Sequence, residues 1–330
     1  MNGVSIIICC HNSAGRIAET LKHLWIQETG EFPLEIVLVD NNCADDTVDV
    51  AKREWIASGQ RIPLRIVGES VPGLSAARIK GVRSANFEYA VFCDDDNWLG
   101  SDYAKRAHNV MERDPGIGVL GGSSTANSDG DLPDWFELVK GNYAVGFQST
   151  GGAADASGRG YLWGAGMVFR KSALESMIGL GVTSVLSDRK GKELSSGGDS
   201  EICKWFLMLG YSLWYDPELK FTHFLESDRL TEKYYAEMIA KQAEAYSCLM
   251  TYDSFTEFVR LQFFERQCGY VKGAFKMLLN MMLSPNEEKA LSLLLGRKIG
   301  NNAIDPVIVR NVSLLLGMKR APERSCANTV

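Results

Sequence analysis

Three consecutive carboxylates close an apolar run in the stretch "AVFCDDDNWLG", residues 90–100. Adjacent acids repel one another, and an ordinary turn needs only one Asp or Asn, so the run predicts a positive partner. Asp94 and Asp96 are two residues apart, which lets both carboxylates reach one oxygen-ligated cation, and such a cation can hold a diphosphate. Taken alone, this spacing is more often a solvated turn or a helix N-terminus.

A second cluster of polar residues lies in "SSGGDSEICKWFLMLG", residues 195–210, where two glycines precede a segment of helical periodicity. Asp199 falls in the first turn of this predicted helix, where a carboxylate is commonly a cap or a partner of the helix dipole. The glycines permit close backbone approach, and Glu201 provides a second acid nearby. The pattern is therefore also consistent with a base that deprotonates a hydroxyl.

His223 is a polar residue in the strand-like run "LKFTHFL". A lone histidine in such a run is more often a core or edge residue whose ring is hydrogen-bonded. As a neutral imidazole it could also complete a metal site that begins with Asp96.

The first half of the chain alternates short apolar runs with segments of helical periodicity, which is the α/β pattern. Strands are predicted at residues 4–10, 35–40, 64–69, 89–94 and 116–122, with one helix starting near Ala44. The strands are continuously apolar, so we expect helices on both faces of the sheet. Asp40 and Asp94 each close a strand, at the carboxyl edge where ligands bind in such sheets.

The pattern changes after residue 122. Residues 123–160 lose the alternation, and the small-residue stretch "STGGAADASGRG" within them is expected to form a mobile loop, with a second loop at 187–198. Residues 161–174 predict a strand that runs into a helix, and residues 211–225 predict two short strands. From about residue 227 only helices are predicted, which places a domain boundary near residue 226.

Composition narrows the function classes. The 330 residues are 45% apolar and 23% charged, as in ordinary globular proteins, and the net charge of -6 with a pI near 5.4 argues against a general nucleic-acid binder. The eight cysteines show no zinc-type spacing, which favours a reducing compartment. We see no charged leader and no apolar stretch long enough to span a bilayer, and therefore expect a cytoplasmic protein.

Taken together, these stretches resemble the successive landmarks of family-two glycosyltransferases of the GT-A fold, the bacterial surface-polysaccharide type in particular. The resemblance covers roughly residues 3–225, and its landmarks are "VSIIICCHNS", "IVLVDNNCADDT", "GLSAARIKG", "FCDDDNW", "YLWGAGMVFRKSAL", "GGDSEICKW" and "FTHF". It implies a mixed central sheet flanked by helices. Residues 1–226 would form the catalytic domain, with nucleotide-sugar binding in 1–122 and the acceptor side in 123–226, and residues 227–330 a helical C-terminal region.

The resemblance also implies roles for individual residues. Asp199 matches the catalytic base, with Glu201 as an assisting acid, and Asp96 with His223 matches the site of a divalent cation, Mn²⁺ or Mg²⁺. Family members commonly have "GED" where this chain has Gly197, Gly198 and Asp199, which leaves one acceptor contact in doubt. Donor contacts are implied for Asp40, Arg78, Asp94 and Asp95.

The implied function is inverting transfer of a sugar from a nucleotide-diphosphate sugar to a hydroxyl of a glycan or lipid-linked glycan in polysaccharide biosynthesis. UDP is the nucleotide most frequent in the family. Trp163 resembles an acceptor-facing residue, although core packing explains it equally well. The alternatives are a non-catalytic nucleotide-sugar or glycan-binding protein and a nucleotidyltransferase.

The end of the chain reverses the overall sign of charge. Residues 289–330 carry seven Lys and Arg against two acids, beside the apolar runs "LSLLLG" and "VIVRNVSLLLG". The pattern predicts either peripheral contact with the inner face of the cell membrane or a helical appendage packed on the protein.

Overall fold

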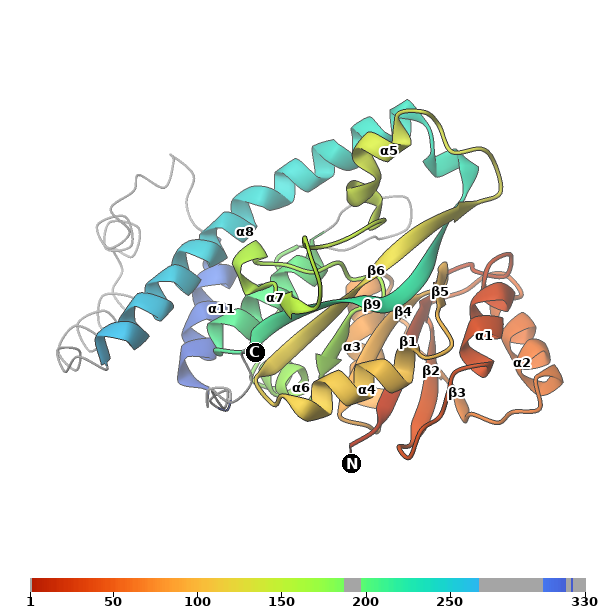
Figure 1. Cartoon of the computed structure of the whole chain (residues 1–330), viewed down its shortest axis with the longest axis horizontal. Coiled ribbons are helices and arrows are strands. Elements are labelled where there is room, and N and C mark those ends of the chain that lie inside the picture. The colour runs from red at the N-terminus through yellow and green to blue at the C-terminus, as the bar shows by residue number, and fades with distance from the viewer. Residues whose placement is uncertain (1, 187–196, 267–304, 319–321, 323–330) are drawn as a thin grey trace.

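The computed structural model describes residues 2–186, 197–266, 305–318 and 322 (Figure 1). In the first third of the chain strands and helices alternate strictly, as the sequence predicts. The elements are β1 (Val4–Cys10), α1 (Ile17–Trp25), β2 (Leu34–Asp40), α2 (Thr47–Ala57), β3 (Leu64–Gly68), α3 (Leu74–Ser84) and β4 (Tyr89–Asp94).

The remaining elements extend this sheet and then leave it. They are β5 (Asn97–Leu99), α4 (Tyr103–Arg113), β6 (Ile117–Ser128), α5 (Phe136–Val139), η1 (Lys140–Tyr143), β7 (Ala154–Asp155), η2 (Ser157–Arg159), β8 (Val168–Arg170), α6 (Lys171–Gly179), α7 (Gly198–Met208), β9 (Ser212–Leu225), η3 (Ser227–Arg229), α8 (Glu232–Arg266) and α11 (Pro306–Gly317). The described strands form one mixed sheet in the order β3-β2-β1-β4-β8-β6-β9-β5, with β7 paired to β9. The pairs among β1 to β4 and the β6–β9 pair are parallel, and the pairs made by β5, β7 and β8 are antiparallel.

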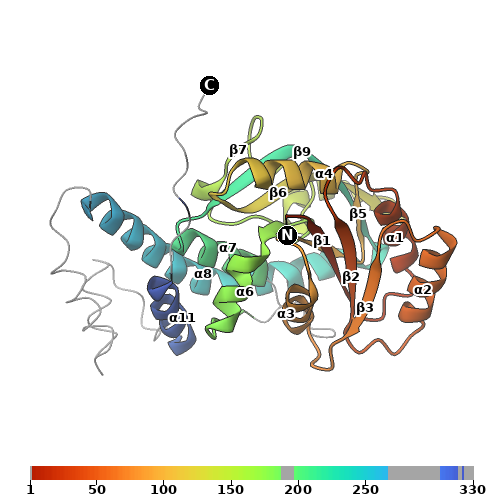
Figure 2. The same cartoon turned by 90° about the horizontal axis from the view of Figure 1, so that it is seen from below.

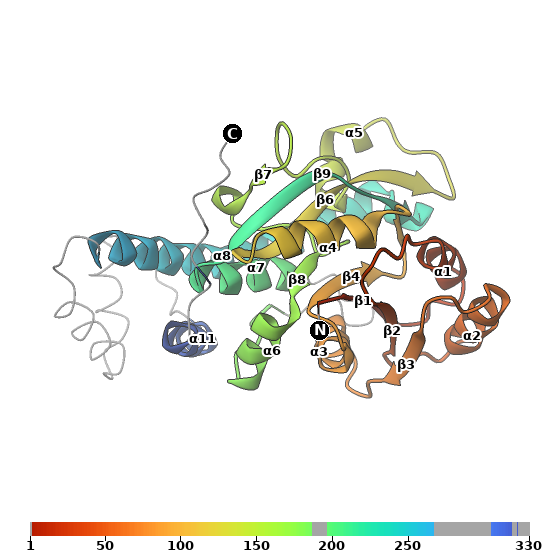
Figure 3. The ribbon, with the colours of Figure 1, turned by 60° about the horizontal axis from the view of Figure 1, so that its bottom comes forward.

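Helices cover both faces of the sheet, because successive side chains of a strand point to opposite sides. On β1, Ile7 belongs to a core cluster with α3, α6 and α7, whereas Ile6 and Ile8 belong to a second cluster with α1, α2 and α4. Figure 2 shows β1, and Figure 3 shows both β1 and β4, between α3 on one side and α4 on the other. The predicted α/β fold class with helices on both faces is confirmed.

The strand predictions differ from the structure in the second half. The stretch 211–225 holds the single strand β9, Ser212–Leu225, rather than two strands, because a bulge accommodates the sequence break at Pro217: Gly121 pairs with Tyr215, but Ser123 pairs with Lys220. Proline lacks an N–H for the ladder and is tolerated at such a bulge. The strand predicted at the start of 161–174 is short, since β8 begins only at Val168, and β6 continues to Ser128, past the end predicted at residue 122.

Two helices follow the sheet. In Figure 1, α8 starts beside α5 and runs down to the left, where α11 packs against it. The apolar side of α11 is buried through Ile308, Val312 and Leu315, which join the core cluster that contains α7 and Phe255 of α8. No helix in the described part of the chain combines the length and the apolarity needed to cross a membrane. The proposed division at residue 226 falls just after β9.

A buried polar network ties α7 to these two helices. Glu201 is fully buried, and its carboxylate accepts hydrogen bonds from the backbone of Val185 at 3.0 Å and from the Tyr252 hydroxyl at 2.8 Å. Asn311 of α11 donates to the same hydroxyl at 2.9 Å and to the Thr183 carbonyl at 2.6 Å. Burial raises the pKa of Glu201, while these hydrogen bonds oppose that shift. The network joins α7, α8, α11 and the segment before residue 187.

We predict that Tyr252→Phe lowers the free energy of unfolding by about 1–3 kcal/mol, because it removes one hydrogen-bond partner from the buried Glu201 and one from the buried Asn311. Urea unfolding measures the change. Tyr246→Phe on the same helix is the matched control: Tyr246 is 63% exposed, so its variant should stay within about 0.5 kcal/mol of the parent. Equal stability of the two variants would show that the Tyr252 hydroxyl contributes nothing to stability.

Candidate active site

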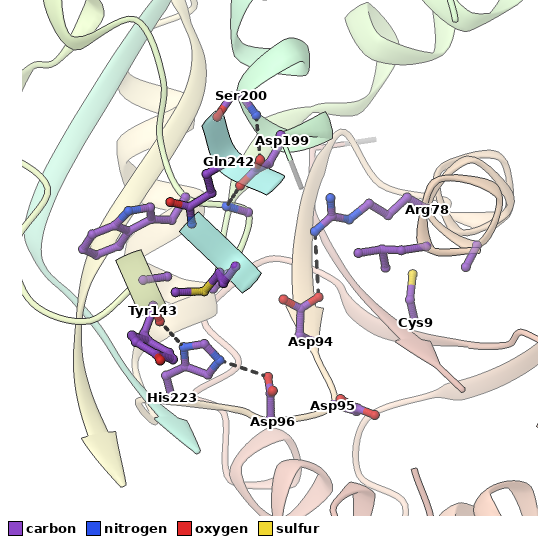
Figure 4. Close-up of a pocket in the computed structure, with 18 of the residues that line it drawn as sticks. Cys9, Arg78, Asp94, Asp95, Asp96, Tyr143, Asp199, Ser200, His223 and Gln242 are labelled. Atoms are coloured by element: carbon purple, nitrogen blue, oxygen red, sulfur yellow. Dashed lines mark hydrogen bonds and ion pairs between the residues drawn. The ribbon is translucent and has the colours of Figure 1, made fainter. Parts of the chain in front are cut away.

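A pocket of about 600 Å³ opens at the carboxyl ends of β1 and β4. The ends of these strands meet at one edge of the sheet because β1 and β4 are parallel neighbours. The opposite wall comes from α7 and α8, so residues far apart in the sequence face one another across the pocket (Figure 4). The predicted site residues that line it are Arg78, Asp94, Asp95, Asp96, Trp163, Asp199 and His223.

Each acid of the Asp94–Asp96 run faces an arginine of its own. The Arg78 Nη2 lies 3.9 Å from Asp94 Oδ1, the Arg16 Nη2 lies 2.8 Å from Asp95 Oδ2, and the Arg229 Nη1 lies 2.9 Å from Asp96 Oδ2. Burial raises the pKa of Asp94, and the Arg78 guanidinium opposes this shift. The positive partner that the sequence predicted is thus supplied in part by the protein itself.

Asp96 and His223 form a pair that fits a cation. The Nδ1 of His223 lies 2.8 Å from the carbonyl oxygen of Tyr143, and because a carbonyl can only accept, Nδ1 carries the hydrogen. In the neutral ring Nε2 then offers a lone pair, and it lies 3.5 Å from Asp96 Oδ1. A carboxylate oxygen and an imidazole lone pair that face each other are a donor set suited to a divalent cation.

Further ligands for such a cation would have to come from outside this pair. In the described ranges, no group of three or more His, Cys, Asp or Glu side chains is arranged to hold a metal ion. Divalent cations bound to diphosphates commonly take phosphate oxygens and water as their other ligands. The pair is therefore suited to a cation that arrives with a phosphorylated ligand.

Asp199 enters the pocket from the first turn of α7 (Figure 4). Its Oδ2 accepts a hydrogen bond of 2.6 Å from the backbone N–H of Gly164, and its Oδ1 accepts one of 2.8 Å from Ser200. Gly164 has no room for a side chain, since an added Cβ would lie 2.8 Å from Arg78 Nη2 and 2.9 Å from Asp199 Cβ. These contacts fix the carboxylate, and Figure 4 shows it and the Asp96–His223 pair on different sides of Asp94.

Two predicted site residues do not line the pocket. Asp40 ends β2 as expected, but its carboxylate accepts a hydrogen bond of 2.9 Å from the Cys43 N–H within its own loop. Glu201 is buried in the network with Tyr252 described above. That burial argues against Glu201 as an assisting acid, because no substrate reaches it.

Much of the remaining wall of the pocket is made by residues that no sequence pattern indicated. The sequence around Arg16 and Arg229 does not mark them as site residues. The only indication was that the three acids require positive partners. The wall also includes one face of α8, with Met238, Gln242, Ala245, Tyr246 and Leu249. Trp163 is only 8% exposed, and the Arg159 guanidinium lies 5.7 Å from its ring and 4.4 Å from the half-exposed ring of Tyr161.

Comparison with known proteins identifies the family to which the chain belongs. The sequence profile of the family described as Glycosyl transferase family 2 matches residues 5–178. The chain belongs to glycosyl transferase family 2. The predicted family is thereby confirmed.

Curated relatives of this family-2 chain are remote. It is 28% identical over 153 residues to EpsH of Bacillus subtilis, whose name assigns it as a glycosyltransferase, covering 46% of this chain and 37% of EpsH. It is 28% identical over 128 residues to the poly(ribitol-phosphate) beta-glucosyltransferase of Bacillus spizizenii, covering 38% of this chain and 20% of that protein. Under two thirds of each relative's length is therefore covered.

A solved structure agrees on the fold of the family-2 chain. S. aureus TarS 1-349 in complex with UDP-GlcNAc superposes with a TM-score of 0.52 at 16% identity, over 89% of this chain and 80% of that one. At this identity the similarity establishes the fold and nothing finer. The predicted GT-A fold is confirmed.

We predict that Gly164→Ala destabilises the protein by about 1–3 kcal/mol, because the new methyl group must displace Arg78 or Asp199. Denaturant unfolding measures it. The control is Gly158→Ala in the same segment, where an added Cβ meets nothing within 4 Å and stability should change little. A Gly164→Ala protein as stable as this control would mean that the site tolerates displacement of the two side chains.

Proposed function

We propose that this protein transfers a sugar from a nucleotide-diphosphate sugar, a UDP-sugar in particular, to a hydroxyl of a glycan or lipid-linked glycan in polysaccharide biosynthesis. The observation that carries the proposal is one pocket that holds both an acid–imidazole pair and, apart from it, the carboxylate of Asp199. The names of the relatives support it: one acts on poly(ribitol-phosphate), and TarS was solved with UDP-GlcNAc.

The donor side of the pocket would bind the nucleotide diphosphate. Asp96 and His223 would hold a divalent cation, Mn²⁺ or Mg²⁺, which supplies positive charge where the leaving diphosphate becomes more negative. Arg78 is 6% exposed and stacks 4.9 Å from the Phe92 ring, so its guanidinium is held in place near Asp94. We assign it, with Asp94 and Asp95, to donor binding. Asp40 would contact the base from the adjacent strand end.

The acceptor side would place a hydroxyl against Asp199. The carboxylate is fixed by two backbone N–H groups, and an ionised carboxylate can accept a proton. Asp199 would take the hydroxyl proton while that oxygen attacks the anomeric carbon on the face away from the diphosphate. This opposition of base and leaving group gives inversion at the anomeric carbon.

Aromatic side chains support a sugar acceptor. Trp163, Tyr161 and Tyr246 line the pocket, and Tyr246 is 63% exposed on α8. Aromatic faces stack on the apolar faces of sugar rings. We propose that the acceptor lies along these rings and the α8 wall.

Peripheral membrane contact through residues 289–330 stays a prediction. Within this region α11 turns its apolar side to the protein, and most of the other residues lie outside the described ranges. A non-catalytic sugar-nucleotide binder and a nucleotidyltransferase are the competing functions. Turnover of a UDP-sugar distinguishes a transferase from a non-catalytic binder. The identity of the products distinguishes it from a nucleotidyltransferase.

We expect UDP to bind at least about tenfold more tightly with Mn²⁺ than in a chelator, because the cation offsets the repulsion between the diphosphate and the Asp94–Asp96 run. Titration calorimetry measures both affinities, and a rise in melting temperature with UDP and Mn²⁺ together provides a second readout. Equal affinity in EDTA would remove the cation from the proposed function.

Asp199→Asn should lower turnover by about 10²–10⁴-fold and leave UDP affinity unchanged, because it removes a base and not a donor contact. Release of UDP from UDP-glucose and UDP-N-acetylglucosamine, with water as the acceptor, is the assay. Asp102→Asn, at an exposed carboxylate at the start of α4, is the matched control. Near-parental turnover of Asp199→Asn would place the base elsewhere.

A further inference from the structure

Arg229 differs from the other two arginines that face the acidic run. Arg78 and Arg16 lie within the stretch matched by the family profile, residues 5–178, whereas Arg229 ends η3, after the last strand. Arg229 also pairs with Asp96, the acid assigned to the cation. The structure therefore pairs the Arg229 guanidinium with the same Asp96 carboxylate that a divalent cation would need.

The geometry at Asp96 makes the two cations competitors. Oδ2 of Asp96 accepts the 2.9 Å bond from Arg229, and Oδ1 faces the lone pair of His223 at 3.5 Å. A cation between Oδ1 and the imidazole would lie about 2–2.6 Å from the carboxylate whose other oxygen the guanidinium holds. With Asp96 8% exposed, water screens their repulsion poorly. Arg229 must leave Asp96, or weaken that bond, for the cation to bind well.

The surroundings of Arg229 keep it at the pocket after such a change. Its backbone carbonyl accepts a 3.1 Å bond from the Tyr143 hydroxyl, and its guanidinium carbon lies 5.9 Å from the Tyr234 ring. Its Nε is buried and, among the described residues, has no hydrogen-bond partner. A guanidinium that lines a pocket with donor capacity to spare is suited to phosphate oxygens, which it can bind in a bidentate fashion.

We propose that Arg229 exchanges partners: it neutralises Asp96 in the empty pocket and moves to the diphosphate when cation and nucleotide bind together. The inference rests on the proposed function. It explains how the charge of Asp96 is balanced both before and after the two ligands bind. The cation alone is opposed by Arg229, and the nucleotide alone finds Arg229 engaged by Asp96. Each ligand therefore raises the affinity for the other, by the same factor in both directions.

The test compares the parent protein with Arg229→Gln in calorimetric titrations of Mn²⁺ without nucleotide, Mn²⁺ with saturating UDP, and UDP with Mn²⁺. In Arg229→Gln we expect nucleotide-free Mn²⁺ to bind about tenfold more tightly and UDP with Mn²⁺ to bind about tenfold more weakly, since a charged hydrogen bond is lost in each case. The coupling between the two ligands should fall accordingly. A purely structural role would weaken both affinities together and leave the coupling unchanged.

Two further variants control for charge and for folding. Arg106→Gln removes an arginine from another buried carboxylate, Asp216 at 2.8 Å, away from the pocket, and should leave Mn²⁺ affinity near that of the parent. Arg229→Lys keeps the charge and should keep nucleotide-free Mn²⁺ binding weak, which preserves the test if Arg229→Gln does not fold. Unchanged or weaker Mn²⁺ binding in folded Arg229→Gln, or tighter binding in Arg229→Lys, would overturn the exchange alone. A parent protein that binds no UDP at all would overturn the proposed function with it.

Discussion

Repulsion among Asp94, Asp95 and Asp96 is the constraint to which the rest of the pocket responds. Two like charges about 4 Å apart near a protein surface repel by about 4 kcal/mol, and burial adds to the cost of keeping each one ionised. The fold turns each carboxylate toward an arginine from a different place: the loop after β1, helix α3, and the turn after β9. These ion pairs also tie three distant segments to the end of β4. The same ion pairs therefore balance the charge of the acids and hold the pocket together.

The two acids on α7 show how position on a helix divides similar residues between different roles. Residues two apart are separated by about 200° around a helix, so Asp199 and Glu201 face nearly opposite sides. Asp199 consequently points into the pocket, whereas Glu201 points into the interior and anchors α8 through Tyr252. Glu201 thus holds in place the helix that carries Asp199.

Features carried by a short run of sequence could be predicted, and features made by distant residues could not. The strands β1 to β4 follow from continuous apolar runs, and Asp94, Asp96 and Asp199 stand at or next to recognisable ends of strands or helices. His223 is recognisable as a polar residue within a strand-like run. Arg16 and Arg229 look like ordinary surface arginines until the fold brings them to the acids. That β9 is one continuous strand could not be predicted either. Proline commonly ends a strand, and β9 continues past Pro217 only because it pairs with β6 on both sides of it.

The C-terminal helices belong to the pocket more closely than the pattern of the sequence indicates. Asp199, His223, Arg229 and the α8 wall all follow residue 178, where the match to the family profile ends. Asn311 of α11 lies more than 100 residues from Glu201, yet it shares the Tyr252 hydroxyl with it. Apolar side chains of α11 also pack in the core cluster that contains α7, the helix that presents Asp199. The region that the sequence pattern sets apart as an appendage therefore packs directly against the helix of the proposed base.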